Sequence, residues 1–246
     1  MTNLLEINNL SVDFPSRRGQ VAAVNKVSIT VAKGEVLGLV GESGAGKSTV
    51  GNSVINLLEP PGRISGGEII FDGTRIDQMS NEEMRKIRGA RIGTIFQDPQ
   101  TSLNPLMTIG KQLSETLIET LKISGASARE KSIELLDSVG IPNSKARLDA
   151  YPHQFSGGMR QRVVIALAMA GDPDLIIADE PTTALDVSIQ KQILDLIKSL
   201  CKQRNLGVII VTHDIGVIAE IADRVAVMYN GQLVEQGKVT QVLQKP

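Results

Sequence analysis

Nine consecutive residues carry the clearest chemistry in this sequence, because they match the pattern G-x-x-x-x-G-K-[ST] with an extra glycine inside it. The glycines let successive backbone N–H groups turn inward around phosphate oxygens, and a helix N-terminus behind them adds positive potential. The pattern therefore predicts a phosphate-binding loop, in which Lys47 reaches the β- and γ-phosphates of a nucleotide and the Ser48 hydroxyl ligates Mg²⁺. The loop residues are Gly41, Glu42, Ser43, Gly44, Ala45, Gly46, Lys47, Ser48 and Thr49.

Two adjacent carboxylates, Asp179 and Glu180, follow the apolar run Leu175–Ala178. Nucleotide sites hold Mg²⁺ through a carboxylate at the end of such a strand, and this is the role expected for Asp179. A second carboxylate beside the metal ligand can polarise an attacking water, so Glu180 is the candidate general base. On this motif alone, a surface carboxylate at a strand terminus is the alternative for Glu180.

Polar residues also end two further apolar runs. His213 follows Val208–Thr212, and Gln97 closes Ile92–Phe96. Ligands of open α/β sheets bind at the carboxyl ends of the strands, so these residues, the phosphate loop and the two carboxylates are expected at one place. There His213 can hydrogen-bond the γ-phosphate or the water, although a histidine after a strand more often has no function.

The elements that must position these residues alternate between short Val-, Ile- and Leu-rich runs and helical patterns. This alternation predicts an α/β fold with a mainly parallel central sheet. The N-terminal part is more polar and turn-bounded, which favours an antiparallel arrangement, and Asp72-Gly73 supports a hairpin there. The clearest buried strands are Val36–Val40, Ile92–Phe96, Leu175–Ala178 and Val208–Thr212, and the N-terminal candidates are Leu4–Phe14, Val27–Val31 and Gly67–Phe71.

The strand signal disappears between Asp98 and Gly158. Gln112–Leu121 and Ala128–Val139 have amphipathic helical patterns, and Ser127 with Glu130 predicts a capping box for the second. We therefore expect one domain over residues 1–246, with a helical subdomain at 98–158 inserted into the α/β core. Further along, Val187–Gln203 predicts a helix with a core-facing stripe at Ile189, Ile193, Leu196, Ile197 and Leu200.

The composition excludes several classes of function. The 246 residues are 41% hydrophobic and 22% charged with a net charge of −1, as in an ordinary folded protein without an electrostatic reason to bind nucleic acid. With no Trp, two Tyr and four Phe, a base-stacking platform is not expected. The single cysteine, Cys201, excludes an intrachain disulfide or a cysteine-based metal site and is predicted to be a buried structural thiol.

Neither a signal peptide nor a membrane span is predicted. The N-terminus has no basic start followed by an apolar run, and the longest apolar stretches are far too short to cross a bilayer. We expect a cytoplasmic protein that meets the membrane through partner subunits. The last residues, Gln244-Lys245-Pro246, include no evident capping element, which leaves open a longer protein or one half of a fused double cassette.

One further motif indicates the family. Phe155, Ser156, Gly157, Gly158, Met159, Arg160, Gln161 and Arg162 resemble the signature motif of ABC ATPases, with Phe and Met where Leu and Gln are frequent. The likeness runs essentially end to end and in the family order: phosphate loop, Gln97 as the Q-loop glutamine, signature, the strand ending at Glu180, a D-loop at Ala184-Leu185-Asp186, and His213 as the switch histidine. The fold expected from this resemblance is the P-loop NTPase core of an ABC ATPase, with an N-terminal antiparallel β subdomain and the inserted helical subdomain.

The resemblance also implies cofactors, partners and residue roles. ATP and Mg²⁺ are the expected cofactors, with Ser48, Gln97 and Asp179 as metal ligands and Lys47, Gln97, Glu180 and His213 as catalytic residues. A second ABC ATPase chain is expected to bind head to tail, so that Ser156, Gly157 and Gly158 of one chain face the γ-phosphate bound by the other; the start of a helix there also suits an anion. Phe14 is the candidate for stacking on adenine, and a core or loop phenylalanine is the alternative.

The finer resemblance is to the ATPases of dipeptide and oligopeptide importers, carried by the signature, Gln97–Pro105 and Thr182–Gln190. It implies two transmembrane permease subunits, moved through the helical subdomain and Gln97, and an extracytoplasmic substrate-binding protein. Nickel importers are close relatives, so nickel import is the alternative, followed by an exporter ATPase, an ABC ATPase outside transport and a catalytically silent cassette. The sequence does not distinguish a homodimer from a heterodimer.

Overall fold

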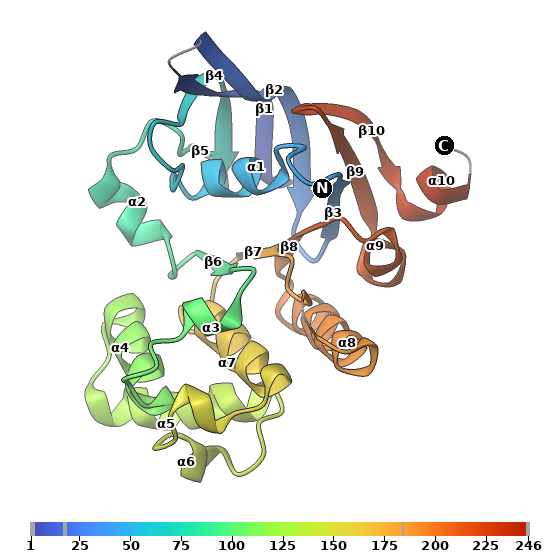
Figure 1. The fold of residues 1–246 in the computed structure, drawn as a ribbon. Helices are drawn as coiled ribbons and strands as arrows, with labels where there is room; N and C mark the ends of the chain where they lie inside the picture. The colour runs from blue at the N-terminus through green and yellow to red at the C-terminus, as the bar shows by residue number, and fades with distance from the viewer. Residues whose placement is uncertain (1–2, 17–18, 184, 245–246) are drawn as a thin grey trace. The chain divides into compact units, whose positions relative to one another are not determined.

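The computed structural model describes residues 3–16, 19–183 and 185–244. The chain forms two units: the first comprises Met1–Arg85 and Leu200–Pro246, and the second comprises Lys86–Ser199 (Figure 1). The phosphate loop and His213 belong to the first unit, whereas Gln97, the signature and the carboxylate pair belong to the second. Each unit is described separately below.

The N-terminal part of the first unit is an antiparallel sheet, as predicted. Its strands β1 (Asn3–Ser16), β2 (Gly19–Ala32), β4 (Arg63–Phe71) and β5 (Thr74–Arg75) lie in the order β2-β1-β4-β5. The predicted Asp72-Gly73 turn joins β4 to β5, and both residues have positive φ, as the favoured two-residue hairpin turn requires. Strands β1 and β2 are longer than predicted because they pair through several bulges, which interrupt the alternation of buried and exposed side chains.

The first unit also contains the parallel strands that carry the phosphate loop and His213. β3 (Val36–Gly41) lies between β8 (Gly207–Thr212) and β9 (Arg224–Tyr229) and runs parallel to both, and β10 (Gln232–Lys238) pairs antiparallel with β9. Both β3 and β8 are buried almost throughout, which explains their continuous apolar sequences. Helix α9 (Ile215–Ile221) packs closely on β3, where a Cβ on Gly38 would lie 2.5 Å from Cδ1 of Ile218. Helices α1 (Lys47–Val54) and α10 (Val239–Gln244) also belong to this unit, as do most of α2 (Asn81–Ile87) and the end of α8 (Val187–Arg204).

The second unit is mostly helical. Its strands β6 (Ile92–Ile95) and β7 (Leu175–Asp179) pair in parallel, and residues 96–174 between them are all described and contain no strand. Helices α4, α5 and α7 contact one another in this stretch (Figure 1), and their apolar side chains, including Leu113, Leu136 and Val163, are buried. The helices around and within it are α2 (Asn81–Ile87), α3 (Pro99–Ser102), α4 (Ile109–Leu121), α5 (Gly125–Ser138), α6 (Ser144–Arg147), the 3₁₀ helix η1 (Pro152–Gln154), α7 (Gly157–Met169) and α8 (Val187–Arg204).

One helix start was predicted wrongly. Helix α5 begins at Gly125, and its N-cap is Ser124, whose side chain accepts a hydrogen bond from the backbone N–H of Ser127. Ser127 is therefore inside the first turn and does not form the predicted capping box with Glu130. Since both serines stand before the same apolar pattern, the local sequence suits either start.

Cys201 is buried, as predicted, and its thiol donates to the carbonyl oxygen of Leu206 at 3.1 Å. Burial raises the pKa of this thiol to about 11, so it stays protonated and unreactive near neutral pH. Among the described residues, no helix combines the length and apolarity that crossing a bilayer requires.

Candidate nucleotide-binding and hydrolysis site

The phosphate loop connects the end of β3 at Gly41 to the start of α1 at Lys47. Lys47 is buried, and its ammonium group donates to the carbonyl oxygens of Gly41 and Glu42 at 2.9 Å each, which closes the loop on itself. The N-cap of α1 is Gly46, in the left-handed conformation and with no side-chain cap. The first N–H groups of α1 therefore have no capping side chain, which is the arrangement that suits an anion.

The glycines of this loop are required by their surroundings as well as by the ligand. Gly44 and Gly46 have φ of +81° and +94°, values that L side chains rarely adopt. A Cβ on Gly46 would collide with the carbonyl oxygen of Ala23, and one on Gly41 with that of Met228. The loop is thus seated against β2 and β9 of the same unit.

A turn that the sequence reasoning missed secures the loop. Asn230 and Gly231 join β9 to β10, both with positive φ, and the N–H of Gly231 donates to the carbonyl oxygen of Ala45 at 3.1 Å. The carbonyl oxygen of Gly231 accepts from the N–H of Asn25 at 2.7 Å. The Asn-Gly pair was the available signal, because it is typical of a two-residue hairpin turn.

His213 lies at the same edge of the first unit's parallel strands as the phosphate loop. Val40 of β3 pairs in register with Thr212 of β8, so Gly41 and His213 leave neighbouring strands at the same level. The Thr212 hydroxyl accepts from the N–H of Asp214, and the Asp214 carboxylate caps α9 through the N–H of Gly216 at 2.7 Å. The exposed imidazole of His213 is therefore attached to a backbone segment whose neighbours, Thr212 and Asp214, are held by hydrogen bonds.

In the second unit, Gln97 and the carboxylate pair also meet at one strand edge. Ile95 of β6 pairs with Ala178 of β7, and the side-chain N–H of Gln97 donates to Oε2 of Glu180 at 3.1 Å. The same oxygen accepts a hydrogen bond from the hydroxyl of Thr183 at 2.8 Å. Thr183 was not assigned to the site from the sequence. Asp179 and Glu180 are half-buried, so both carboxylates lie at the boundary between the unit's core and solvent.

The signature residues form the start of α7. Ser156 is the N-cap and accepts from the N–H of Met159, whereas Phe155 is buried, with the Arg147 guanidinium 5.5 Å from the centre of its ring. Ser156 and Gly157 are exposed, and a Cβ on Gly158 would lie only 2.6 Å from Cγ2 of Ile189. A 13-residue helix thus presents its N-terminus at the surface of this chain.

The structure also places Phe14 and the predicted D-loop. The half-buried Phe14 lies on β1, and its ring is packed so closely to Gly62 that a Cβ there would lie 2.7 Å away. Its contact with adenine remains a prediction. In the predicted D-loop, Ala184 lies outside the described residues, while Leu185 lies 3.7 Å from a Cβ built on Gly157.

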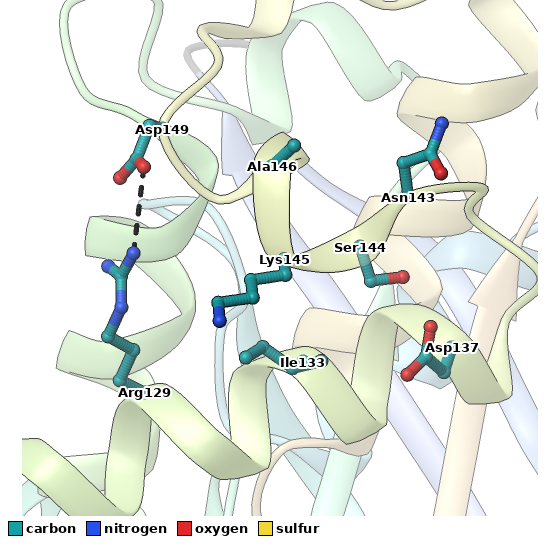
Figure 2. A pocket seen from close by; sticks show the side chains of 8 residues that line it. All are labelled: Arg129, Ile133, Asp137, Asn143, Ser144, Lys145, Ala146 and Asp149. Carbon is teal, nitrogen blue, oxygen red and sulfur yellow. Dashed lines mark ion pairs between the residues drawn. The ribbon is translucent and has the colours of Figure 1, made fainter.

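A separate pocket of about 740 Å³ lies in the second unit beside α5 and α6 (Figure 2). It includes both positive and negative side chains, and Arg129 and Asp149 form an ion pair at 3.5 Å across part of it. None of the predicted site residues lines this pocket, so it is distinct from the features above. Its lining is Arg129, Ile133, Asp137, Asn143, Ser144, Lys145, Ala146 and Asp149.

Comparison with known protein families identifies the chain. Residues 24–183 match the family model described as ABC transporter, a match that covers most of the chain. The chain belongs to the ABC transporter family. It is an ATPase that binds ATP, and the family expected from the signature motif is confirmed.

Relatives of this ABC ATPase match it over its full length. The oligopeptide transport ATP-binding protein OppD of Bacillus subtilis is 51% identical over 247 aligned residues, covering 100% of this chain and 69% of its own. The dipeptide transport ATP-binding protein DppD of the same organism is 49% identical, covering 100% of this chain and 74% of its own.

Solved structures confirm the predicted fold class. A dimeric ATP-binding cassette in a post-hydrolysis state with ADP and Pi bound superposes with a TM-score of 0.83 at 30% identity, over 96% of this chain and 98% of that one. CbiO1 of Clostridium perfringens, part of an ABC transporter complex, has a TM-score of 0.85 at 28% identity, over 100% of this chain and 92% of its own.

Proposed function

We propose that this ABC ATPase binds and hydrolyses Mg-ATP to power the import of dipeptides or oligopeptides. The observation that carries the ATP chemistry is the phosphate loop, with its uncapped helix start and the buried ammonium group of Lys47. The peptide substrate is supported by the names of relatives about half identical over the whole chain. The signature, Gln97–Pro105 and Thr182–Gln190 independently favour the same group.

The phosphate loop and Lys47 would bind the triphosphate. An ammonium group has three donors, and two of them point to the carbonyl oxygens of Gly41 and Glu42. The third can donate to a β- or γ-phosphate oxygen, while the backbone N–H groups of the loop and of the first turn of α1 surround the phosphates. Phe14 would stack on the adenine.

Each of the three predicted magnesium ligands offers an oxygen atom of the kind that the ion prefers. Mg²⁺ prefers oxygen ligands and is held by one or two carboxylates together with substrate phosphates. Ser48 would bind the ion through its hydroxyl, and Asp179 through its half-buried carboxylate. The amide nitrogen of Gln97 donates to Glu180, so Gln97 would bind the ion through its amide oxygen. When bound, the ion would neutralise charge that develops on the phosphate oxygens.

Hydrolysis needs a base and a donor near the phosphate that is transferred. Glu180 would accept a proton from water as the water oxygen attacks the γ-phosphorus and the bond to the ADP oxygen breaks. His213 would hydrogen-bond the γ-phosphate or this water. These roles are proposals supported by the Gln97–Glu180 hydrogen bond and by the place of His213 at the phosphate-loop edge of β3 and β8.

A second ATPase chain would complete each site. The start of α7 is exposed in this chain at Ser156 and Gly157 and half-buried at Gly158. A helix N-terminus suits an anion, so these residues would contact the γ-phosphate bound by the partner. Solved relatives that form dimers support this assembly. The partner would be a second copy or a sister ATPase.

Two permease subunits and an extracytoplasmic substrate-binding protein would complete the importer. The second unit carries exposed large apolar side chains at Phe96, Leu106 and Tyr151, of which Leu106 is the most exposed. Leu106 is 86% exposed on a loop fixed by reciprocal hydrogen bonds between Asn104 and the side chain of Gln112. A rigid exposed anchor loses little entropy on binding, so we propose that the loop carrying Leu106 meets a permease and places the ATPase at the cytoplasmic face of the membrane.

Replacing Leu106 by Ser should reduce transport and leave hydrolysis by the purified chain unchanged. Losing an interface anchor costs about 2 kcal/mol of binding free energy. Peptide uptake and ATPase activity measured in parallel test this, with Leu57→Ser, an exposed leucine of the first unit, as the control. Wild-type uptake by the Leu106 variant would contradict the proposed contact with a permease.

The substrate is tested by uptake in cells that carry Glu180→Gln, a change that should stop ATP-driven import. Uptake of a labelled short peptide and of labelled nickel is compared with that of cells carrying Glu235→Gln, a half-buried glutamate of β10 outside the proposed site. We expect loss of peptide uptake alone. Loss of nickel uptake alone would assign the protein to the metal importers, and no change in either would contradict an importer and favour an exporter or a process outside transport.

A further inference from the structure

Two donors meet on one carboxylate oxygen of Glu180. Oε2 accepts from the side-chain N–H of Gln97 at 3.1 Å and from the hydroxyl of Thr183 at 2.8 Å. We propose that Thr183 is a positioning residue, which holds the Glu180 carboxylate in the orientation that hydrolysis requires. This inference rests on the proposed role of Glu180 as general base.

The backbone from Glu180 to Thr183 forms a turn that places the Thr183 hydroxyl beside the Glu180 carboxylate. Glu180 has φ of +46°, a conformation uncommon for a residue other than glycine. The N–H of Thr183 donates to the carbonyl oxygen of Glu180 at 3.1 Å, which closes a turn with Pro181 at its second position, where proline is favoured. Thr182 is buried and anchors the turn in the unit's core.

This geometry favours a role in positioning. A glutamate side chain has several rotatable bonds, and one hydrogen bond fixes its oxygen without fixing the plane of the carboxylate. Donors from two different segments, Gln97 after β6 and Thr183 after β7, restrict that plane as well. Since a base acts only when aligned with the proton it removes, small losses of orientation reduce turnover without changing nucleotide affinity.

The test uses the purified full chain and two substitutions at the same position. Thr183→Val keeps the shape and removes the donor, whereas Thr183→Ser keeps the donor and removes a methyl group. We expect Thr183→Val to lower kcat about tenfold, a part of the roughly 10²–10⁴-fold that a general base contributes, with the KM for ATP unchanged. Thr183→Ser should restore turnover to near the wild-type value.

The control is Thr120→Val, which removes a threonine hydroxyl that donates at 2.7 Å to the carbonyl oxygen of Thr116 in α4. It should hydrolyse ATP like the wild type. If Thr183→Val does not fold, as judged by circular dichroism and thermal unfolding, Thr183→Ala takes its place in the comparison with Thr183→Ser.

Wild-type kcat in Thr183→Val would overturn the positioning role, as would equal losses in the valine and serine variants, because the donor would then not matter. Glu180→Gln is measured in the same assay to separate this inference from the proposed function. If Glu180→Gln is inactive while Thr183→Val is fully active, only the inference fails. If Glu180→Gln hydrolyses ATP normally, the proposed base itself is wrong.

Discussion

Glu180→Gln should lower the steady-state ATPase rate of the purified chain by at least the roughly 10²–10⁴-fold expected for losing a general base. The amide has nearly the shape of the carboxylate and an oxygen that can still accept from Gln97 and Thr183, which both donate to Glu180 in this structure. It has no comparable basicity, however, so it cannot take the proton of the attacking water. The substitution therefore separates the chemical step from the local structure.

ATP binding should survive this change, since the phosphate loop lies in the other unit of the chain and does not depend on Glu180 for its hydrogen bonds. Nucleotide that is bound and not hydrolysed should keep the two chains together, so ATP-dependent dimers should accumulate in light scattering. The measurements are phosphate release and molecular mass with and without ATP. Glu235→Gln is the control, and a Glu180→Gln protein with unchanged turnover would exclude the proposed base.

Of the parallel strands, the sequence predicted β3, β6, β7 and β8 and missed β9, for a physical reason: burial along β9 is interrupted. A strand buried on both faces must be apolar at every position, so β3 and β8 are visible as uninterrupted hydrophobic runs. Their ends are then equally visible, because polar residues begin where burial stops. This is why the phosphate loop and His213 could be placed at one edge without any structural information.

Other parts depend on geometry that local sequence does not encode. Ser124 and Ser127 are equally good helix caps by residue type, and packing of α5 decides between them. Thr183 could not be assigned to the site, because its hydrogen bond to Glu180 depends on the positive φ of Glu180 and on the turn through Pro181. The role of Gly231 was missed similarly: its Asn-Gly turn was visible, but its contact with Ala45 arises only when β9 lies beside β3.

Lys47→Ala should abolish tight ATP binding, for two physical reasons. It removes the positive charge expected at the β- and γ-phosphates, where hydrogen bonds from charged donors each contribute about 1.5–3 kcal/mol. It also removes the ammonium group that joins the carbonyl oxygens of Gly41 and Glu42, so the loop loses the hydrogen bonds that hold its first two residues. A total loss of about 3 kcal/mol corresponds to roughly a hundredfold weaker binding.

A titration with a fluorescent ATP analogue measures this affinity, and thermal unfolding monitors the fold. Lys111→Ala, an exposed lysine of α4 in the other unit, serves as the control and should bind like the wild type. Because Lys47 is buried, its removal will also affect stability, and the comparison must be made well below the unfolding transition of the variant. If the folded Lys47→Ala protein bound ATP with wild-type affinity, the triphosphate would have to be held by other groups, and the phosphate loop would no longer be the site that defines this enzyme.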